Sequence, residues 1–101
     1  MKEIDWSSLS FGYMKTDYNV RCWYRDGAWG EIEVSSEETL NIHIAATCLH
    51  YGQEAFEGLK AYRCPDGKVR VFRMDENAAR LQSSCRGIMM PELPTELFEA
   101  M

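Results

Sequence analysis

The alternation of apolar and polar positions along the chain predicts two β-hairpins. Strand-forming residues over 20–24 precede the turn Arg25-Asp26-Gly27, and a return strand is expected over 28–32. A second hairpin is expected where strands over 59–63 and 68–73 flank Pro65-Asp66-Gly67, because these residue types suit a tight turn. The same alternation predicts another strand over 40–44.

A helix is expected between the two hairpins. It would begin at Thr47, with Thr47 or a neighbour as its cap, and run to about residue 55. Glycine at the corner Phe56-Glu57-Gly58 would then let the chain turn sharply into the following strand. We expect Glu57 to bond the neighbouring backbone rather than to act as a catalytic acid.

Two further helices are expected after the second hairpin. The first would span 76–86, with Asp75 as its N-cap and Gly87 as its stop, and the second would be capped by Thr95. These elements predict an α+β fold, in which antiparallel hairpins form a sheet and at least two helices pack on it.

Helical spacing divides the helix over 76–86 into two faces. The apolar stripe consists of Ala78, Leu81 and Cys85. The polar strip consists of Asn77, Arg80 and Ser84.

Composition places the chain among ordinary globular proteins. Its 101 residues suit one domain or part of one, and the net charge of -5 argues against nucleic acid or an anionic membrane as a partner. The apolar runs are too short to span a membrane, and the four cysteines lack the spacing of a zinc site or a redox pair, so we expect free thiols in the cytoplasm. The last expected helix stops at Met101 after barely two turns, which predicts that residues 1–101 are part of a longer protein.

Three segments together resemble the N-terminal region of one enzyme family. They are LSFGYMKTDYNV, LHYGQEAFEGLKAY and, after the turn, VRVFRMDENAARLQSS. This combination is similar to branched-chain amino acid aminotransferases, which are pyridoxal phosphate enzymes of fold type IV. The resemblance implies a homodimeric transaminase that exchanges an amino group between leucine, isoleucine or valine and 2-oxoglutarate.

The resemblance also implies which residues of this chain form part of the site. Arg80 matches the arginine that holds the cofactor phosphate, and Phe11, Tyr51 and Phe56 match positions that line the pocket for the substrate side chain. The alternative for Arg80 is a surface ion pair with Glu76. In the family the catalytic lysine lies in a second domain, so the chain contains no catalytic residue and is expected to be inert alone.

Two other functions remain open. One keeps the fold but changes the chemistry to that of a D-amino acid transaminase or an aminodeoxychorismate lyase. The other is a stand-alone interaction domain without catalysis. Translation of the gene beyond Met101 would discriminate between an enzyme and such a domain.

Overall fold

The computed structural model describes residue 5, residue 7 and residues 12–101. The chain divides into two compact units, of which the first ends at Ile42 and the second runs from His43 to Met101.

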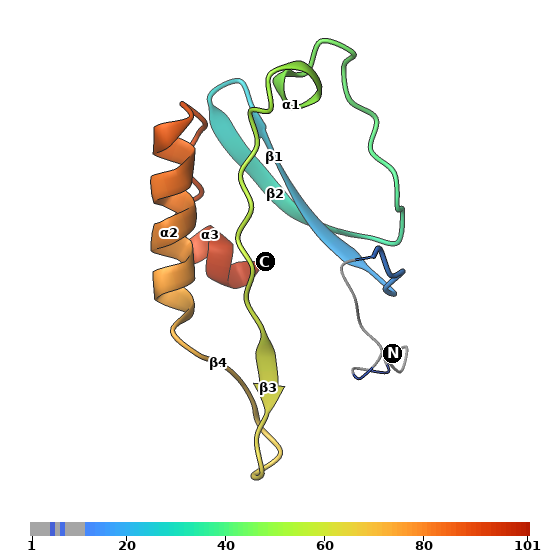
Figure 1. Ribbon diagram of the computed structural model, residues 1–101, viewed down its shortest axis with the longest axis vertical. Coiled ribbons are helices and arrows are strands. Elements are labelled where there is room, and N and C mark those ends of the chain that lie inside the picture. The colour runs from blue at the N-terminus through green and yellow to red at the C-terminus, as the bar shows by residue number, and fades with distance from the viewer. Residues whose placement is uncertain (1–4, 6, 8–11) are drawn as a thin grey trace. The chain divides into compact units, whose positions relative to one another are not determined.

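The first unit contains the first expected hairpin. Strand β1 (Asn19–Arg25) pairs in antiparallel register with β2 (Ala28–Ser35), as Figure 1 shows. The connecting residues Asp26 and Gly27 have φ values of 52° and 80°, which is the left-handed conformation that a tight two-residue hairpin turn requires. The prediction of this hairpin is therefore confirmed.

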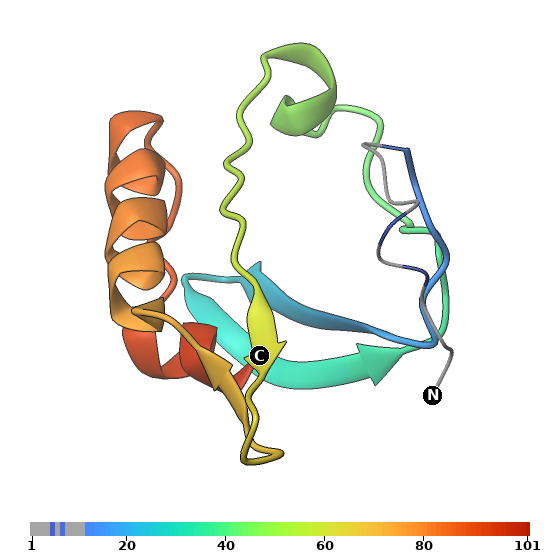
Figure 2. The ribbon, with the colours of Figure 1, turned by 60° about the horizontal axis from the view of Figure 1, so that its bottom comes forward.

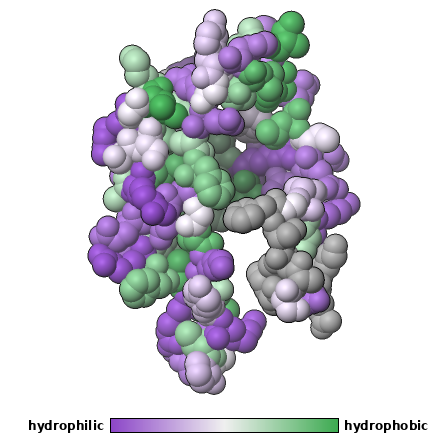
Figure 3. All heavy atoms as spheres, viewed as in Figure 1, coloured by the Kyte–Doolittle hydropathy of each residue, from purple (hydrophilic) through white to green (hydrophobic). Residues whose placement is uncertain are grey.

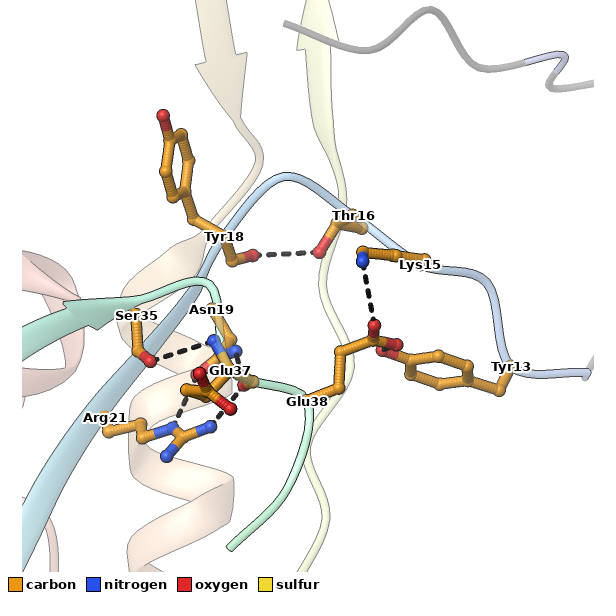
Figure 4. Close-up of polar contacts among 9 residues, drawn as sticks. All are labelled: Tyr13, Lys15, Thr16, Tyr18, Asn19, Arg21, Ser35, Glu37 and Glu38. Atoms are coloured by element: carbon orange, nitrogen blue, oxygen red, sulfur yellow. Dashed lines mark hydrogen bonds and ion pairs between the residues drawn. The ribbon is translucent and has the colours of Figure 1, made fainter.

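Side chains join the open end of this hairpin to the segments on either side, as Figure 4 shows. The Asn19 amide donates to the backbone carbonyl of Glu37 at 2.7 Å. Glu38 accepts a hydrogen bond from the Tyr13 hydroxyl at 2.8 Å and lies 3.1 Å from the Lys15 ammonium. Hydrogen bonding to Glu38 raises the pKa of both Tyr13 and Lys15.

The prediction of a strand over 40–44 is wrong. Residues 40–43 lie in no regular element, and Ile44-Ala45 form a turn. The backbone amide of Ala45 donates to Nδ1 of His43, and that of Ala46 donates to the backbone carbonyl of His43. These local bonds favour a turn over an extended strand.

The second unit supplies the remaining elements. They are α1 (Thr47–His50), β3 (Ala61–Arg63), β4 (Val69–Val71), α2 (Met74–Gly87) and α3 (Thr95–Ala100). Strands β3 and β4 form the second expected antiparallel hairpin, and helices α2 and α3 contact each other. The α+β class is confirmed, although the hairpins form two separate two-stranded sheets instead of one.

The helices begin differently from the capping predictions. Arg73, with φ of 50°, occupies the N-cap position of α2, and Asp75 lies inside the first turn. There its carboxylate still interacts favourably with the positive end of the helix dipole. Thr47 and Thr95 are the first residues of α1 and α3 rather than caps, and neither helix has a side-chain cap from the described residues.

The N-cap of α1 is Ala46, a neighbour of Thr47, and that of α3 is Pro94. The two threonine hydroxyls bond other side chains, which explains why neither threonine is a cap. The Thr47 hydroxyl donates to the side-chain oxygen of Gln53 at 2.6 Å. The Thr95 hydroxyl accepts from the Gln82 amide at 3.1 Å, and the same amide bonds the backbone carbonyl of Leu93. Gln82 therefore joins α2 to the start of α3.

The sharp corner expected at Phe56-Glu57-Gly58 lies earlier in the chain. Helix α1 ends at His50, and Gly52 follows with a φ of 64°, a left-handed conformation that commonly ends helices. Residues 52–60 then lie in no regular element. Gly58 has no positive φ, so the change of direction depends on Gly52.

Little apolar surface is buried in the part of the chain that the structure describes. Ala78 and Cys85, both from the expected apolar stripe, are its buried hydrophobic residues, and Leu81 is half-buried. Many larger apolar side chains are exposed, and Figure 3 shows apolar residues in green at the surface among hydrophilic ones.

Candidate functional site

The candidate site lies where the segment over 52–60 runs beside α2. Figures 1 and 2 both show this strand-like segment alongside the long helix. Two side chains of the segment bond residues of the helix region. Near one end, the Gln53 amide donates to the backbone carbonyl of Ile88 at 2.8 Å. Further along, Glu57 bonds two side chains of α2.

Glu57 is the centre of this second contact. Its Oε2 accepts from Nε of Arg80 at 2.8 Å, and its Oε1 accepts both from Nη2 of Arg80 and from Nδ2 of Asn77, the latter at 2.8 Å. The Asn77 amide also donates to the backbone carbonyl of Gly58 at 3.2 Å. We call Glu57, Asn77 and Arg80 the carboxylate cluster.

The two charged side chains of the cluster differ in solvent exposure. The Glu57 side chain is only 4% exposed, whereas that of Arg80 is 69% exposed. Hydrogen bonds from Arg80 and then from Asn77 lower the pKa of Glu57 from 4.5 to about 2, so the carboxylate is ionised at neutral pH. The bond to Glu57 raises the pKa of Arg80, which stays a cation.

Only two of the three residues of the polar strip share a partner. Asn77 and Arg80, three positions apart on one face, meet the same carboxylate. Ser84 instead donates to the backbone carbonyl of Arg80 at 3.1 Å, within its own helix.

Two interactions in this region differ from those weighed in the sequence: the surface ion pair given as the alternative for Arg80, and the backbone bonds expected for Glu57. Arg80 does not pair with Glu76, because Glu76 lies 2.9 Å from Arg73 and Arg80 bonds Glu57. Glu57, expected to bond the backbone, bonds side chains from 20 and 23 residues further along the chain. The sequence signal was an acid in the segment before the hairpin, together with the amide and the guanidinium of the polar strip on the following helix.

Arg80 keeps donors for a second partner. A guanidinium has five N–H donors in a planar fork. Glu57 engages the edge formed by Nε and Nη2, which leaves Nη1 and the other hydrogen of Nη2 facing outward from the pair. Two oxygens of a phosphate can accept from such an edge, and Arg80 is exposed enough to meet one. The residues present therefore fit the phosphate of pyridoxal phosphate.

The aromatic residues assigned to the substrate pocket are exposed. Tyr51 is 84% exposed and Phe56 89%. The Phe56 ring lies beside Gly58, where an added Cβ would be 3.4 Å from the ring, an ordinary van der Waals contact. Phe11 lies outside the described residues. The pocket role of these three residues stays a prediction.

An open groove borders the carboxylate cluster. It has a volume of about 520 Å³ and is lined in part by Asn77 of the cluster and by Gly58, whose carbonyl Asn77 bonds. Neither Tyr51 nor Phe56 lines it.

Two other kinds of feature are absent from residue 5, residue 7 and residues 12–101. No helix there has the length and hydropathy needed to cross a membrane. No group of three or more His, Cys, Asp or Glu side chains there is arranged to hold a metal ion.

Comparison with known proteins identifies relatives along nearly the whole chain, although no family model matches it. The branched-chain-amino-acid aminotransferase of Haemophilus influenzae is 50% identical over 97% of the chain, and that of Helicobacter pylori is 46% identical over 97%. Branched-chain-amino-acid transaminase 1 of Bacillus subtilis is 44% identical over 92%. The chain spans 26–29% of the length of these relatives and matches their N-terminal region. The resemblance seen in the sequence is confirmed for this region.

Proposed function

We propose that residues 1–101 form the N-terminal small domain of a branched-chain amino acid aminotransferase, which transfers the amino group of leucine, isoleucine or valine to 2-oxoglutarate. The observation that carries this proposal is the identity of 50% over 97% of the chain to a relative of that name. Nothing among the relatives favours a D-amino acid transaminase, a lyase or a stand-alone interaction domain.

The proposal includes pyridoxal phosphate as cofactor. When bound, this cofactor supplies the carbonyl group that receives the amino group and the conjugated ring that stabilises negative charge. Arg80 would hold its phosphate through the outer edge of the guanidinium, while Glu57 occupies the inner edge. The chain contributes binding and orientation in this scheme, and the lysine that carries the chemistry would come from the larger part of the enzyme.

Phe11, Tyr51 and Phe56 would form one wall of the substrate pocket. Aromatic rings provide large, rigid apolar surfaces, which suit the side chain of a branched aliphatic amino acid. The exposure of Tyr51 and Phe56 supports this proposal, because these rings are available for contact with a substrate or with the rest of the enzyme.

The exposed apolar surface supports a role inside a larger protein. Ile44, Phe72 and Met89 are 80–89% exposed in addition to the two rings. Apolar side chains of this size normally contribute to a core or an interface. The proposal therefore includes contact with a second domain and, from the resemblance, a cytoplasmic homodimer.

The test is cofactor retention and activity in the full-length protein. It should transfer the amino group of leucine to 2-oxoglutarate when pyridoxal phosphate is present. Arg80→Ala should weaken cofactor affinity roughly 10- to 100-fold, since a hydrogen bond to a charged group contributes about 1.5–3 kcal/mol. Arg80→Lys should recover only part of the affinity, because lysine keeps the charge and loses the fork.

Arg86→Ala is the matched control. Arg86 lies on the same helix, is 57% exposed and pairs with Glu92. Its replacement should leave cofactor affinity unchanged. A full-length protein that does not transaminate leucine contradicts the proposed function, and equal affinities of the Arg80 and Arg86 variants contradict the role of Arg80.

A further inference from the structure

We propose that Glu57 is a positioning residue, which orients the guanidinium of Arg80 so that its outer N–H edge faces the cofactor phosphate. The inference rests on the proposed function and assigns to Glu57 no contact with substrate or cofactor. It adds a residue from outside α2 to the phosphate site.

Without a partner, the exposed Arg80 side chain would be free to move. An arginine on an exposed helix face samples several rotamers, and ordering it costs conformational entropy. Two parallel bonds from Nε and Nη2 to one carboxylate fix both the position and the plane of the guanidinium. The entropy cost is then met during folding rather than during phosphate binding, which is the advantage of a preorganised site.

Glu57 is itself held in place. Its side chain is 4% exposed, and the Asn77 amide bonds both its carboxylate and the backbone carbonyl of Gly58. Asn77 thus ties the Glu57 carboxylate and the adjoining backbone to α2. A carboxylate held in this way, with little exposure of its side chain, is a rigid support for an exposed cation.

The pair between Arg73 and Glu76 shows the contrast on the same helix. It has a single ion-pair contact of 2.9 Å, and both side chains are 61% exposed. Such a pair contributes little and fixes no orientation. The two-point contact and the low exposure of the Glu57 side chain distinguish the Glu57–Arg80 pair.

The negative charge of Glu57 has an opposing effect, because it weakens the attraction of Arg80 for a phosphate. Arg80 is 69% exposed, so water and salt screen this charge effect. The orientation is not screened in this way. We therefore expect loss of Glu57 to weaken phosphate binding rather than to strengthen it.

The experiment titrates the full-length protein with pyridoxal phosphate and, separately, with pyridoxal, which lacks the phosphate. Glu57→Gln should weaken the affinity for pyridoxal phosphate about three- to tenfold, the range expected when one arginine must be ordered on binding. The affinity for pyridoxal should not change. Glu76→Gln, the matched control, should change neither affinity.

Glu57→Asp separates orientation from charge. It keeps the carboxylate but withdraws it by one methylene, so it should lose affinity for pyridoxal phosphate much as Glu57→Gln does. Wild-type affinity in Glu57→Asp together with weak binding in Glu57→Gln would show that charge matters and would overturn the inference. An equal loss for both ligands would show a general effect on the fold and would also overturn it.

The double variant Glu57→Gln/Arg80→Ala tests whether Glu57 acts through Arg80. It should bind pyridoxal phosphate no more weakly than Arg80→Ala alone, because the residue that Glu57 orients is already gone. Additive losses contradict the inference. Normal binding by Glu57→Gln with weak binding by Arg80→Ala overturns the role of Glu57 and leaves the proposed function standing. A wild-type protein that binds no pyridoxal phosphate overturns both.

Discussion

The side chain of Gln53 donates at 2.8 Å to the backbone carbonyl of Ile88, which lies 35 residues further along the chain. Its oxygen accepts from the Thr47 hydroxyl at 2.6 Å. Ile88 directly follows α2, and Thr47 begins α1. One amide therefore joins the start of the short helix to the end of the long one.

Replacement of Gln53 should destabilise the full-length protein modestly. Gln53→Ala removes both hydrogen bonds, and because the residues are partly exposed we expect a loss of about 1 kcal/mol in the free energy of unfolding. Gln53→Glu keeps the acceptor for Thr47 but places a carboxylate oxygen against the Ile88 carbonyl oxygen, so it should lose at least as much stability as Gln53→Ala. Urea unfolding measures both variants, and an unchanged midpoint for Gln53→Ala contradicts the structural link.

Two glycines of the segment should respond differently to alanine. Gly52→Ala forces a side chain onto a φ of 64°, although no atom lies within 4 Å of the added Cβ, so the cost of about 1 kcal/mol comes from the backbone alone. Gly58 has no positive φ, and its added Cβ meets only the Phe56 ring at 3.4 Å. Gly58→Ala should therefore be the milder change in thermal unfolding. The reverse order contradicts the assignment of the turn to Gly52.

The sequence predicted structure correctly where the interactions that determine it are local in the chain. The hairpin turns were predictable because Asp26-Gly27 and Asp66-Gly67 carry their conformational preference locally. The chain segment of α2 was also predictable, since its stripe has helical spacing and Gly87 ends it.

Predictions that depended on distant partners were less successful. Thr95 suits a cap by its residue type, but its hydroxyl bonds Gln82, 13 residues earlier. Glu57 was assigned to the nearby backbone, although its partners lie on α2. Residue type alone does not reveal which of several competing partners a polar side chain selects in the folded chain.

Phe56→Ala should change substrate selection more than stability. Removing a fully buried phenylalanine typically lowers the free energy of unfolding by about 3–5 kcal/mol. The Phe56 side chain is 89% exposed in this chain, so its removal should cost less stability. In the full-length enzyme the ratio of leucine to glutamate turnover should fall, because an apolar wall of the pocket is lost.

Phe72→Ala is the control for this prediction. Phe72 is 80% exposed and follows β4, outside the residues assigned to the pocket. Its replacement should leave the leucine to glutamate ratio unchanged. If Phe56→Ala unfolds the enzyme without altering that ratio in the folded fraction, the ring belongs to a core and the pocket assignment fails.

Acid should weaken the fold through Glu57. The hydrogen bonds from Arg80 and Asn77 lower its pKa from 4.5 to about 2 in the folded chain. A group with a lowered folded-state pKa contributes stability that is fully present above its unfolded pKa, here about 4.5, and is lost as the pH falls toward about 2. Between these values folding must keep Glu57 ionised while the unfolded chain binds a proton.

The comparison of wild type with Glu57→Gln isolates this contribution. At neutral pH wild type should be the more stable, because glutamine cannot accept both bonds from the Arg80 fork. The difference in unfolding midpoint between the two proteins should shrink as the pH is lowered from 5 to about 2, the range set by the two pKa values. Denaturant unfolding of the full-length proteins across this range measures the difference, with Glu76→Gln as the control for an exposed pair. A difference that stays constant with pH would show that the pKa of Glu57 is the same in the folded and unfolded chain. The pair with Arg80 would then not lower that pKa.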